Sequence, residues 1–537
     1  MTMLKMTRRK RYVLIGLAVF VLIGIVATLV TARILVGRLD PYLRQQAIQY
    51  LQKRFDADVE MAALRVQMPT VSVFQLIRTR GLGVMVHVDG EALALRLKDR
   101  PDLPPLFKMK NFGFDVDLGK LRANPKTVRH VTLDGMEITI PPRDNRSKVE
   151  RAADHASHES EKTGVIIEEV IVRDATLKIL PKESEKEPLQ FDIHQVRLES
   201  AGKDVAMKYD ASLTNAKPPG EILSRGTFGP WIENEPGDTA LNGKYNFDKA
   251  DLGVFDGIAG VLNSNGEFAG TLSMINVRGE AFVPDFRLKI SGNRVPLKTK
   301  FEVLVDGTNG NTVLKPVVAR LGTTDFTTSG GVIKHEGEER RTISLDVSMP
   351  NGNIQDVLRL AMKGSPFMAG RVAVQTKIDI PPLSGKVREK LQLDGRFEVK
   401  EGRFLQSNIQ NQIDGLSRRG QGQPNNEAIE DVATAMKGKF ELKDEAITFR
   451  SLQFAVPGAA VDLTGGYRFQ GPVDFHGTLK LQAKVSQTMT GWKRWVLKPI
   501  DPFFSKEGAG TFLHIKVEGT AEAPKFGLDR GKKKDKG

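Results

Sequence analysis

Apolar and polar residues alternate along most of the chain after about residue 59, and this pattern limits the folds that are open to it. Successive side chains of a β-strand point to opposite faces, so alternation with a period of two predicts antiparallel strands with one apolar and one solvated face. The sequence therefore predicts a mainly β protein. The apolar positions that we expect to share a face are Leu93, Leu95 and Leu97; Phe286, Leu288 and Ile290; Val372, Val374 and Ile378; and Leu479, Leu481 and Val485.

Glycine precedes the apolar alternation in many of these stretches. Gly243, Gly395 and Gly438 each stand two residues before an aromatic side chain. Glycine permits a tight turn or a bulge, after which a strand re-enters the sheet. Many hairpins in series favour one long sheet, and several ordinary β-domains in a row are the alternative. Short apolar stretches at 251–262 and 354–362 are candidate helices at an end of the sheet.

The N-terminus has a different pattern. Tyr12–Ala32 is a stretch of 21 residues without a formal charge, and a helix of about 20 apolar residues spans the hydrocarbon core of a bilayer. We interpret it as an uncleaved signal anchor with a short basic tail inside; a cleaved secretory signal is the alternative. Residues 37–56 then show helical periodicity, which predicts an amphipathic helix that lies against the membrane or caps the first strands.

Charge and missing motifs exclude several functions. Of the net charge of +14, residues 1–11 contribute +5 and residues 525–537 contribute +4, which leaves the body close to neutral. A nucleic-acid binder concentrates basic charge on a folded face, so we expect no nucleic-acid partner. The chain has no cysteine, no phosphate-binding loop and no nucleophile elbow. We expect no enzyme, no cofactor and no metal, because His155 and His158 lie in a charged linker and Asp115 and Asp117 fit a solvated strand face.

An aromatic and basic segment lies near the C-terminus. Trp492, Trp495, Phe503 and Phe504 are interleaved with lysine and arginine. Amphipathic aromatic residues beside cations suit a membrane interface, and these four are candidate membrane-interface residues. The alternative is a short element that packs its aromatic side chains on the sheet.

Three segments together resemble the AsmA-like family of bacterial envelope proteins (AsmA/TamB-type). The anchor, the helix and then Ala57–Glu60 resemble the opening of these proteins. Val128–Ile138 looks like their recurring strand unit. The closing strand Gly510–Thr520, followed by Pro524, is similar to the end of their C-terminal domains.

The resemblance implies a long, curled antiparallel sheet that forms an open apolar groove, related to bridge-like lipid-transfer proteins. It also implies a bacterial inner-membrane protein, anchored through Tyr12–Ala32 with its body in the periplasm. Phospholipid is the implied ligand, moving from the inner toward the outer membrane, with an outer-membrane or periplasmic protein completing the path. A non-enzymatic scaffold or assembly factor for outer-membrane proteins is the alternative function.

The expected organisation follows from these patterns. In chain order we predict a cytoplasmic tail and transmembrane anchor (1–36), an amphipathic helix (37–56), an N-terminal β-region (57–142), a charged linker (143–163), an AsmA-like β-groove region (164–524) and a basic tail (525–537).

Overall fold

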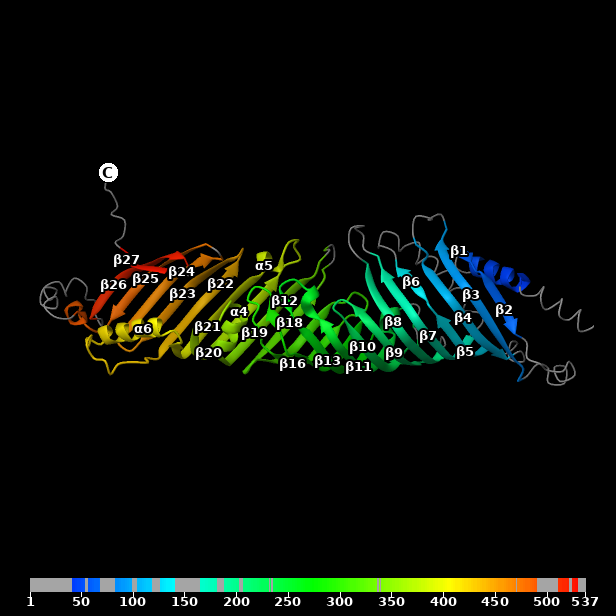
Figure 1. Cartoon of the computed structure of the whole chain (residues 1–537), viewed down its shortest axis with the longest axis horizontal. Helices are drawn as coiled ribbons and strands as arrows, with labels where there is room; N and C mark the ends of the chain where they lie inside the picture. Colours follow the sequence, from blue (N-terminus) through cyan, green and yellow to red (C-terminus); the bar gives the residue numbers. More distant parts are fainter. Residues whose placement is uncertain are drawn as a thin grey trace, which may run out of the picture. The chain divides into compact units, whose positions relative to one another are not determined.

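The computed structural model shows a mainly β protein with few helices (Figure 1). It describes residues 41–53, 57–67, 83–98, 104–117, 126–140, 165–180, 188–201, 206–230, 232, 235–335, 338, 340–469, 471–489, 510–520 and 524–529. The chain divides into two compact units. The first comprises Met1–Ala216 and Ile222–Trp231, and the second Lys217–Glu221 and Ile232–Gly537.

The first unit contains a mixed sheet. Antiparallel pairing joins most neighbouring strands, but β7 pairs in parallel with both β5 and β6. The expectation of a purely antiparallel sheet is therefore wrong here. The strands are β1 (Ala57–Glu60), β2 (Ala63–Gln67), β3 (Met85–Leu97), β4 (Phe107–Asp117), β5 (Lys126–Asp134), β6 (Glu137–Ile140), β7 (Val165–Ile179), β8 (Leu189–Ala201), β9 (Met207–Ala216) and β10 (Pro219–Phe228), which pairs with β9.

A crossover explains the parallel pairing. The predicted linker 143–163 lies outside the described residues, but the strands on either side of it, β6 and β7, are neighbours in one sheet. Parallel neighbours need a long crossover between them, whereas antiparallel neighbours need only a tight turn. The linker is thus a connection within the first unit, and the boundaries between the two units along the chain fall within residues 216–232.

The amphipathic helix caps the first strands. Residues 41–53 are helical, as the periodicity predicts. Ala47, Ile48 and Leu51 pack against a core of Val59, Met61, Leu93 and Met109. The Nε of Arg44 donates a hydrogen bond of 2.8 Å to the carbonyl of Met61. Of the two placements expected for this helix, contact with the strands is the one observed.

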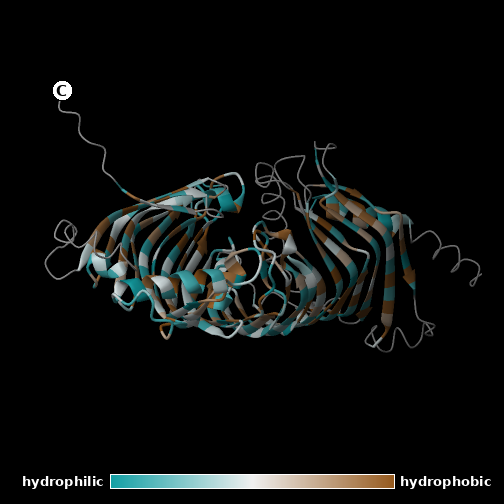
Figure 2. Ribbon diagram, turned by 60° about the vertical axis from the view of Figure 1, so that its left-hand side comes forward, coloured by the Kyte–Doolittle hydropathy of each residue, from teal (hydrophilic) through white to brown (hydrophobic). Residues whose placement is uncertain are grey.

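The second unit contains an antiparallel meander in which each main strand pairs with its neighbour in sequence. Its sheet is curled, as Figure 2 shows. The strands are β11 (Ala240–Asp251), β13 (Val261–Thr271), β14 (Met274–Val283), β16 (Leu297–Val305), β17 (Thr312–Leu321), β18 (Thr324–Ile333), β19 (Thr342–Asn353), β20 (Met368–Ile380), β21 (Gln392–Phe404), β22 (Thr434–Lys443), β23 (Ala446–Val456), β24 (Ala459–Arg468), β25 (Pro472–Leu481), β26 (Thr511–Thr520) and β27 (Pro524–Leu528).

Short helices and a small second sheet lie at the strand ends of this unit. β12 (Ile258–Ala259) pairs with β15 (Arg287–Leu288) apart from the main sheet. The helices are α4 (Ile354–Ala361), α5 (Val387–Lys390) and α6 (Ser407–Gly420), with short 3-10 turns η2 (Pro236–Asp238), η3 (Leu252–Val254) and η4 (Val485–Thr488). The helix predicted at 354–362 is confirmed as α4, whereas 251–262 contains only η3, β12 and the start of β13.

No helix in the described ranges is both long and apolar enough to cross a bilayer. The predicted anchor Tyr12–Ala32 lies outside those ranges, and so do Trp492, Trp495, Phe503 and Phe504.

Candidate functional site: an apolar sheet face

One face of the second unit's sheet is apolar on every strand from β11 to β26. Residues directly opposite each other in an antiparallel pair point to the same face, so the register assigns each side chain. We call this the apolar face. Its members include Tyr245, Phe268, Val277, Phe301, Val303, Leu314, Phe326, Leu345, Val374, Ile378, Phe397, Phe440, Phe449, Leu463, Phe475 and Ile515.

Aromatic rings from four strands follow one another along the apolar face. The ring of Phe397 on β21 lies 6.3 Å from that of Phe440 on β22 and 6.3 Å from that of Phe449 on β23. Phe449 and Phe475 on β25 follow at 5.8 Å. Ring centroids 4.5–7 Å apart are in favourable contact. The rings therefore form a continuous apolar surface across these strands.

Glycines opposite the aromatic residues make this arrangement possible. Gly395 lies opposite Phe440, and Phe397 lies opposite Gly438. A Cβ at Gly438 would stand 2.8 Å from the Phe397 ring, and a Cβ at Gly395 would stand 2.8 Å from the Phe440 ring. Both glycines lie inside strands, so the expectation of a turn is wrong for them, although a register shift follows Gly438 at Lys439/Phe440. Each glycine leaves room for an aromatic ring from the next strand.

Helices cover one border of the apolar face. From α4, Ile354 packs with Val372 and Val399, and Val357 and Leu358 join the same cluster. Further along, Ile413 and Leu416 of α6 pack against a cluster at the ends of β23, β24 and β25. We call this border, where α4 and α6 lie, the α4 rim, and the opposite border, where β20 and β21 are joined through α5, the α5 rim.

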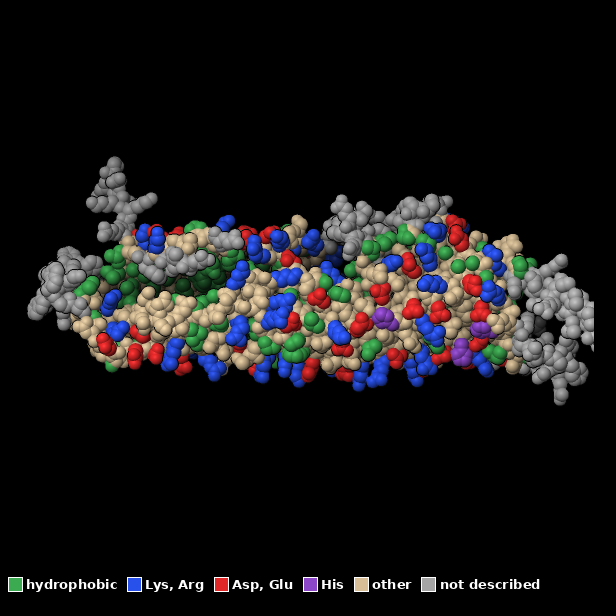
Figure 3. Space-filling model, in the orientation of Figure 1, with side chains coloured by type: hydrophobic (Ala, Val, Ile, Leu, Met, Phe, Trp, Pro, Cys, Tyr) green, Lys and Arg blue, Asp and Glu red, His purple; other side chains and the backbone are tan. Residues whose placement is uncertain are grey.

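Away from the helices the apolar face is only partly covered. Val374 and Phe397 are half-buried, whereas Val372 and Val399 near α4 are 4% and 1% exposed. Figure 3 shows hydrophobic side chains gathered in a hollow over the strands near the C-terminal end of this unit. On the same face Val473, Phe475 and Val517 are 7%, 9% and 6% exposed, so the face combines buried apolar clusters with apolar side chains that remain partly accessible.

The opposite face of the same sheet is polar and carries cross-strand ion pairs. Lys300 pairs with Glu280, and Arg320 with Asp325. Glu302 accepts hydrogen bonds from Lys315 and Arg278, which lower the pKa of its carboxyl to about 2. Exposed ion pairs contribute little to the stability of the fold, but their charges keep this face of the sheet hydrated.

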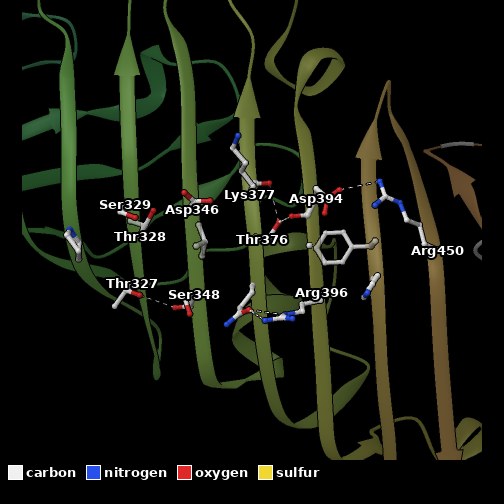
Figure 4. Close-up of a pocket in the computed structure, with 16 residues that line it drawn as sticks. Thr327, Thr328, Ser329, Asp346, Ser348, Thr376, Lys377, Asp394, Arg396 and Arg450 are labelled. Carbon is white, nitrogen blue, oxygen red and sulfur yellow. Dashed lines mark hydrogen bonds and ion pairs between the residues drawn. The ribbon is translucent and has the colours of Figure 1, made fainter.

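A shallow pocket of about 620 Å³ lies on this polar face (Figure 4). Thr327, Asp346, Lys377 and Arg396 are among its lining residues. Hydroxyl, carboxylate, ammonium and guanidinium groups share its lining with Val347 and Phe440, and an aliphatic chain bound there would desolvate the charged groups at a cost in free energy. The apolar face remains the candidate site.

The predicted site residues of the second unit separate into two groups. Val372, Val374 and Ile378 of β20 share the apolar face, and Leu479 and Leu481 of β25 lie on it as well. The stretch Phe286, Leu288 and Ile290 is not a strand of the main sheet, because only Arg287–Leu288 is extended and Ile290 is 45% exposed in a turn. Val485 lies beyond the end of β25, in η4.

The predicted residues of the first unit belong to a packed core. Leu93 is 9% exposed, and Leu95 packs against the same cluster beneath the capping helix. Leu97 ends β3 opposite Ala57, and its side chain lies outside what is described. Sequence reasoning missed the ring series Phe397, Phe440, Phe449 and Phe475, although two glycine–x–phenylalanine repeats carry its signal.

Several titratable side chains of the first unit lie on a partly exposed strand face. The Nδ1 of His87 donates to Oδ1 of Asp115 at 2.6 Å, and its Nε2 lies 2.9 Å from Oδ1 of Asp89; the hydrogen bond with Asp115 raises the pKa of the imidazole. His130 lies 3.4 Å from Glu169. Among the described residues, no group of three or more metal-ligating side chains is placed to hold an ion.

No protein-family model, curated protein or solved structure matches this chain.

Proposed function

We propose that the protein binds phospholipid and shields its acyl chains on the apolar face of the second unit. The observation that carries the proposal is an apolar sheet face whose central side chains are only half-buried, backed by a charged face on the same strands. A structural core needs burial, whereas a ligand surface needs access. A β-sheet of this design supplies a dry surface to a ligand and a wet surface to solvent.

The free energy of moving hydrocarbon out of water supports phospholipid as the ligand. Moving a methylene group from water to an apolar surface is favourable by about 0.8 kcal/mol. A surface of Val, Leu, Ile and Phe that extends over many strands can therefore hold an acyl chain without any specific hydrogen bond. The headgroup needs no burial, because it can stay in solvent at the rim.

The proposal extends to where the protein lies in the cell and what it transports there. The apolar stretch Tyr12–Ala32 anchors the chain in the bacterial inner membrane, with the body in the periplasm. The resemblance to AsmA-like proteins supports transport of phospholipid between the inner and outer membranes and a role in envelope homeostasis. An outer-membrane or periplasmic protein would complete the path. The lipid diffuses along the apolar face, and no covalent chemistry is required of the protein.

Photocrosslinking tests the proposal on neighbouring residues of one strand. A benzophenone amino acid at Leu463, on the apolar face, should capture phospholipid from vesicles of the bacterial lipids phosphatidylethanolamine and phosphatidylglycerol. The same probe at Thr464 is the matched control, because that side chain is exposed on the polar face. Mass spectrometry of the adducts identifies the captured lipid.

Equal capture at both positions, or capture at neither, would contradict an acyl-chain surface. Capture of unfolded outer-membrane protein in preference to lipid would instead favour the assembly-factor alternative.

A further inference from the structure

A two-stranded insertion crosses the apolar face of the second unit. It consists of residues 252–260 and 284–296, which we call the crossing strap, and its two halves pair through β12 and β15. Lys289 ties the halves together, since its Nζ donates to the carbonyls of Gly253 and Phe255 at 2.8 Å each. These bonds make the strap a small folded element of its own.

The strap is joined covalently to the sheet at the α4 rim. β11 and β14 run toward the border where β19 ends and α4 begins, so both halves of the strap start and finish there. Asn293 fixes the strap to the residues that follow α4, because its Nδ2 donates to the carbonyls of Met362 at 2.8 Å and Gly364 at 3.0 Å. Val295 is fully buried at the strap's end. Because α4 itself packs on the apolar face, the strap lies on that side of the sheet.

The strap reaches the α5 rim at its other end. The backbone N–H of Val387, the first residue of α5, donates to Oδ2 of Asp256 at 2.7 Å. A Cβ built at Gly257 would stand 3.8 Å from the Cβ of Val387. The two rims lie at opposite ends of β20, a strand of 13 residues that runs from α4 to α5. An element that contacts both rims therefore spans the apolar face from one rim to the other.

The two attachments differ in kind. At the α4 rim the strap continues into four strands, whereas at the α5 rim it is held without a covalent link, through an exposed hydrogen bond. Such a bond contributes only about 0.5–1.5 kcal/mol net. The strap is thus hinged at the α4 rim and releasable at the α5 rim.

We infer that the crossing strap is a gate that admits lipid sideways into the groove and that its latch is the contact of Asp256 and Gly257 with Val387. This rests on the proposed function, since a gate needs something to admit. With the latch closed, the strap blocks lateral access to the apolar face beneath it. With the latch open, an acyl chain can pass between the strap and the α5 rim.

A reversible covalent latch tests the gate. The chain has no cysteine, so Gly257→Cys with Val387→Cys introduces a single pair, and the Cβ separation suits a disulfide, for which about 3.5–4.5 Å is usual. In the purified full-length chain, a fluorescent long-chain fatty acid reports both the rate of loading and the final amount bound. Gly257→Cys alone is the matched control for the change at a residue with positive φ, and Val387→Cys alone controls for the second substitution; neither can form the bridge.

Oxidation of the pair should slow loading by about tenfold or more, as closing a lid does, and reduction should restore the rate. Asp256→Ala should load faster than the unmodified chain. If the probe binds but oxidised and reduced protein load at the same rate, the inference that the strap is a gate is wrong, while the proposed lipid-binding function stands. If the probe binds neither the unmodified chain nor any variant, both inferences fall.

Discussion

Buried polar side chains fix the positions of the covering helices. Asp414 of α6 is 3% exposed, and its carboxylate accepts hydrogen bonds from the backbone N–H groups of Asp431 at 3.1 Å and Val432 at 3.0 Å. Gln410 donates to the same carboxylate at 2.8 Å. A buried charge is tolerated only where several donors surround it. Asp414 therefore ties the helix to the loop that returns to β22.

Asp117 shows that alternation does not always predict whether a single side chain is exposed. Asp115 and Asp117 are both predicted on a solvated strand face. Asp115 meets His87 there, but Asp117 is 4% exposed and accepts from the backbone N–H of Gly83 at 3.2 Å. Alternation assigns a side chain to one face of the sheet, but it does not show that the backbone at Gly83 contacts Asp117 and that this side chain is buried.

Asp115 is expected to control the pKa of His87. Its hydrogen bond with Asp115 raises the pKa of the imidazole above 6.5. A raised pKa means that the protonated form stabilises the fold, fully below about pH 6.5, and that this contribution is lost as the pH rises through the folded-state pKa. Asp115→Asn should lower the pKa of His87 toward 6.5.

Histidine C2-hydrogen exchange followed by mass spectrometry measures this pKa directly. The associated change in the free energy of unfolding should be below about 1 kcal/mol, because the His87 side chain is 43% exposed. An unchanged pKa in Asp115→Asn would contradict the assigned cause.

At the scale of the strand, glycine and phenylalanine work as cross-strand pairs. A glycine–x–phenylalanine repeat places both residues on one face, and the antiparallel neighbour places its own repeat in the opposite order. Each ring then covers the other strand's glycine, as Gly395 with Phe440 and Gly438 with Phe397 show. The ring shields backbone that the glycine leaves bare, which is known to stabilise sheets.

Gly438→Ala is therefore expected to destabilise the second unit. The new methyl group would stand 2.8 Å from the Phe397 ring and 2.9 Å from the carbonyl oxygen of Ser451, and overpacking of this kind costs about 1–3 kcal/mol. Urea unfolding followed by circular dichroism measures the change.

Gly415→Ala is the matched control for that measurement. Gly415 lies inside α6 with nothing within 4 Å of the added carbon, so alanine there should stabilise the helix by about 0.5–1 kcal/mol. Equal effects of the two substitutions would show that steric contact with Phe397 is not the cause.

The sequence predicts the elements of this fold better than their connections. Alternation correctly indicates β20, β25 and the apolar face, and helical periodicity indicates 41–53 and α4. Alternation does not indicate which strands become neighbours, so the parallel pairing of β7 with β5 and β6 was not predicted. The stretch 286–290 alternates like a strand, yet it folds into the crossing strap, because its partner is the short β12 rather than the main sheet.

For the whole molecule, the proposed function makes a prediction about charge in the groove. Val374→Asp places a carboxylate on the half-buried apolar face, where burying a charge without a partner is costly. Binding of a fluorescent phospholipid should fall by about tenfold or more. Gln375→Asp is the control, since the neighbouring side chain is exposed on the polar face.

Circular dichroism and thermal unfolding check that both variants remain folded. Retained binding in a folded Val374→Asp protein would count against the apolar face as the lipid surface, and parallel losses in both variants would point to a general effect of negative charge.

The nearest-neighbour pairing of the second unit has a consequence for how such a chain can change in length. Each strand of the main sheet in this unit pairs only with the main-sheet strands just before and after it, as the repeats of a solenoid do. A hairpin could therefore be duplicated or lost without disturbing distant pairings, provided that its two strands keep the same alternation. Growth by whole hairpins would preserve both faces at every step, so the length of the apolar face is a quantity that evolution can adjust gradually.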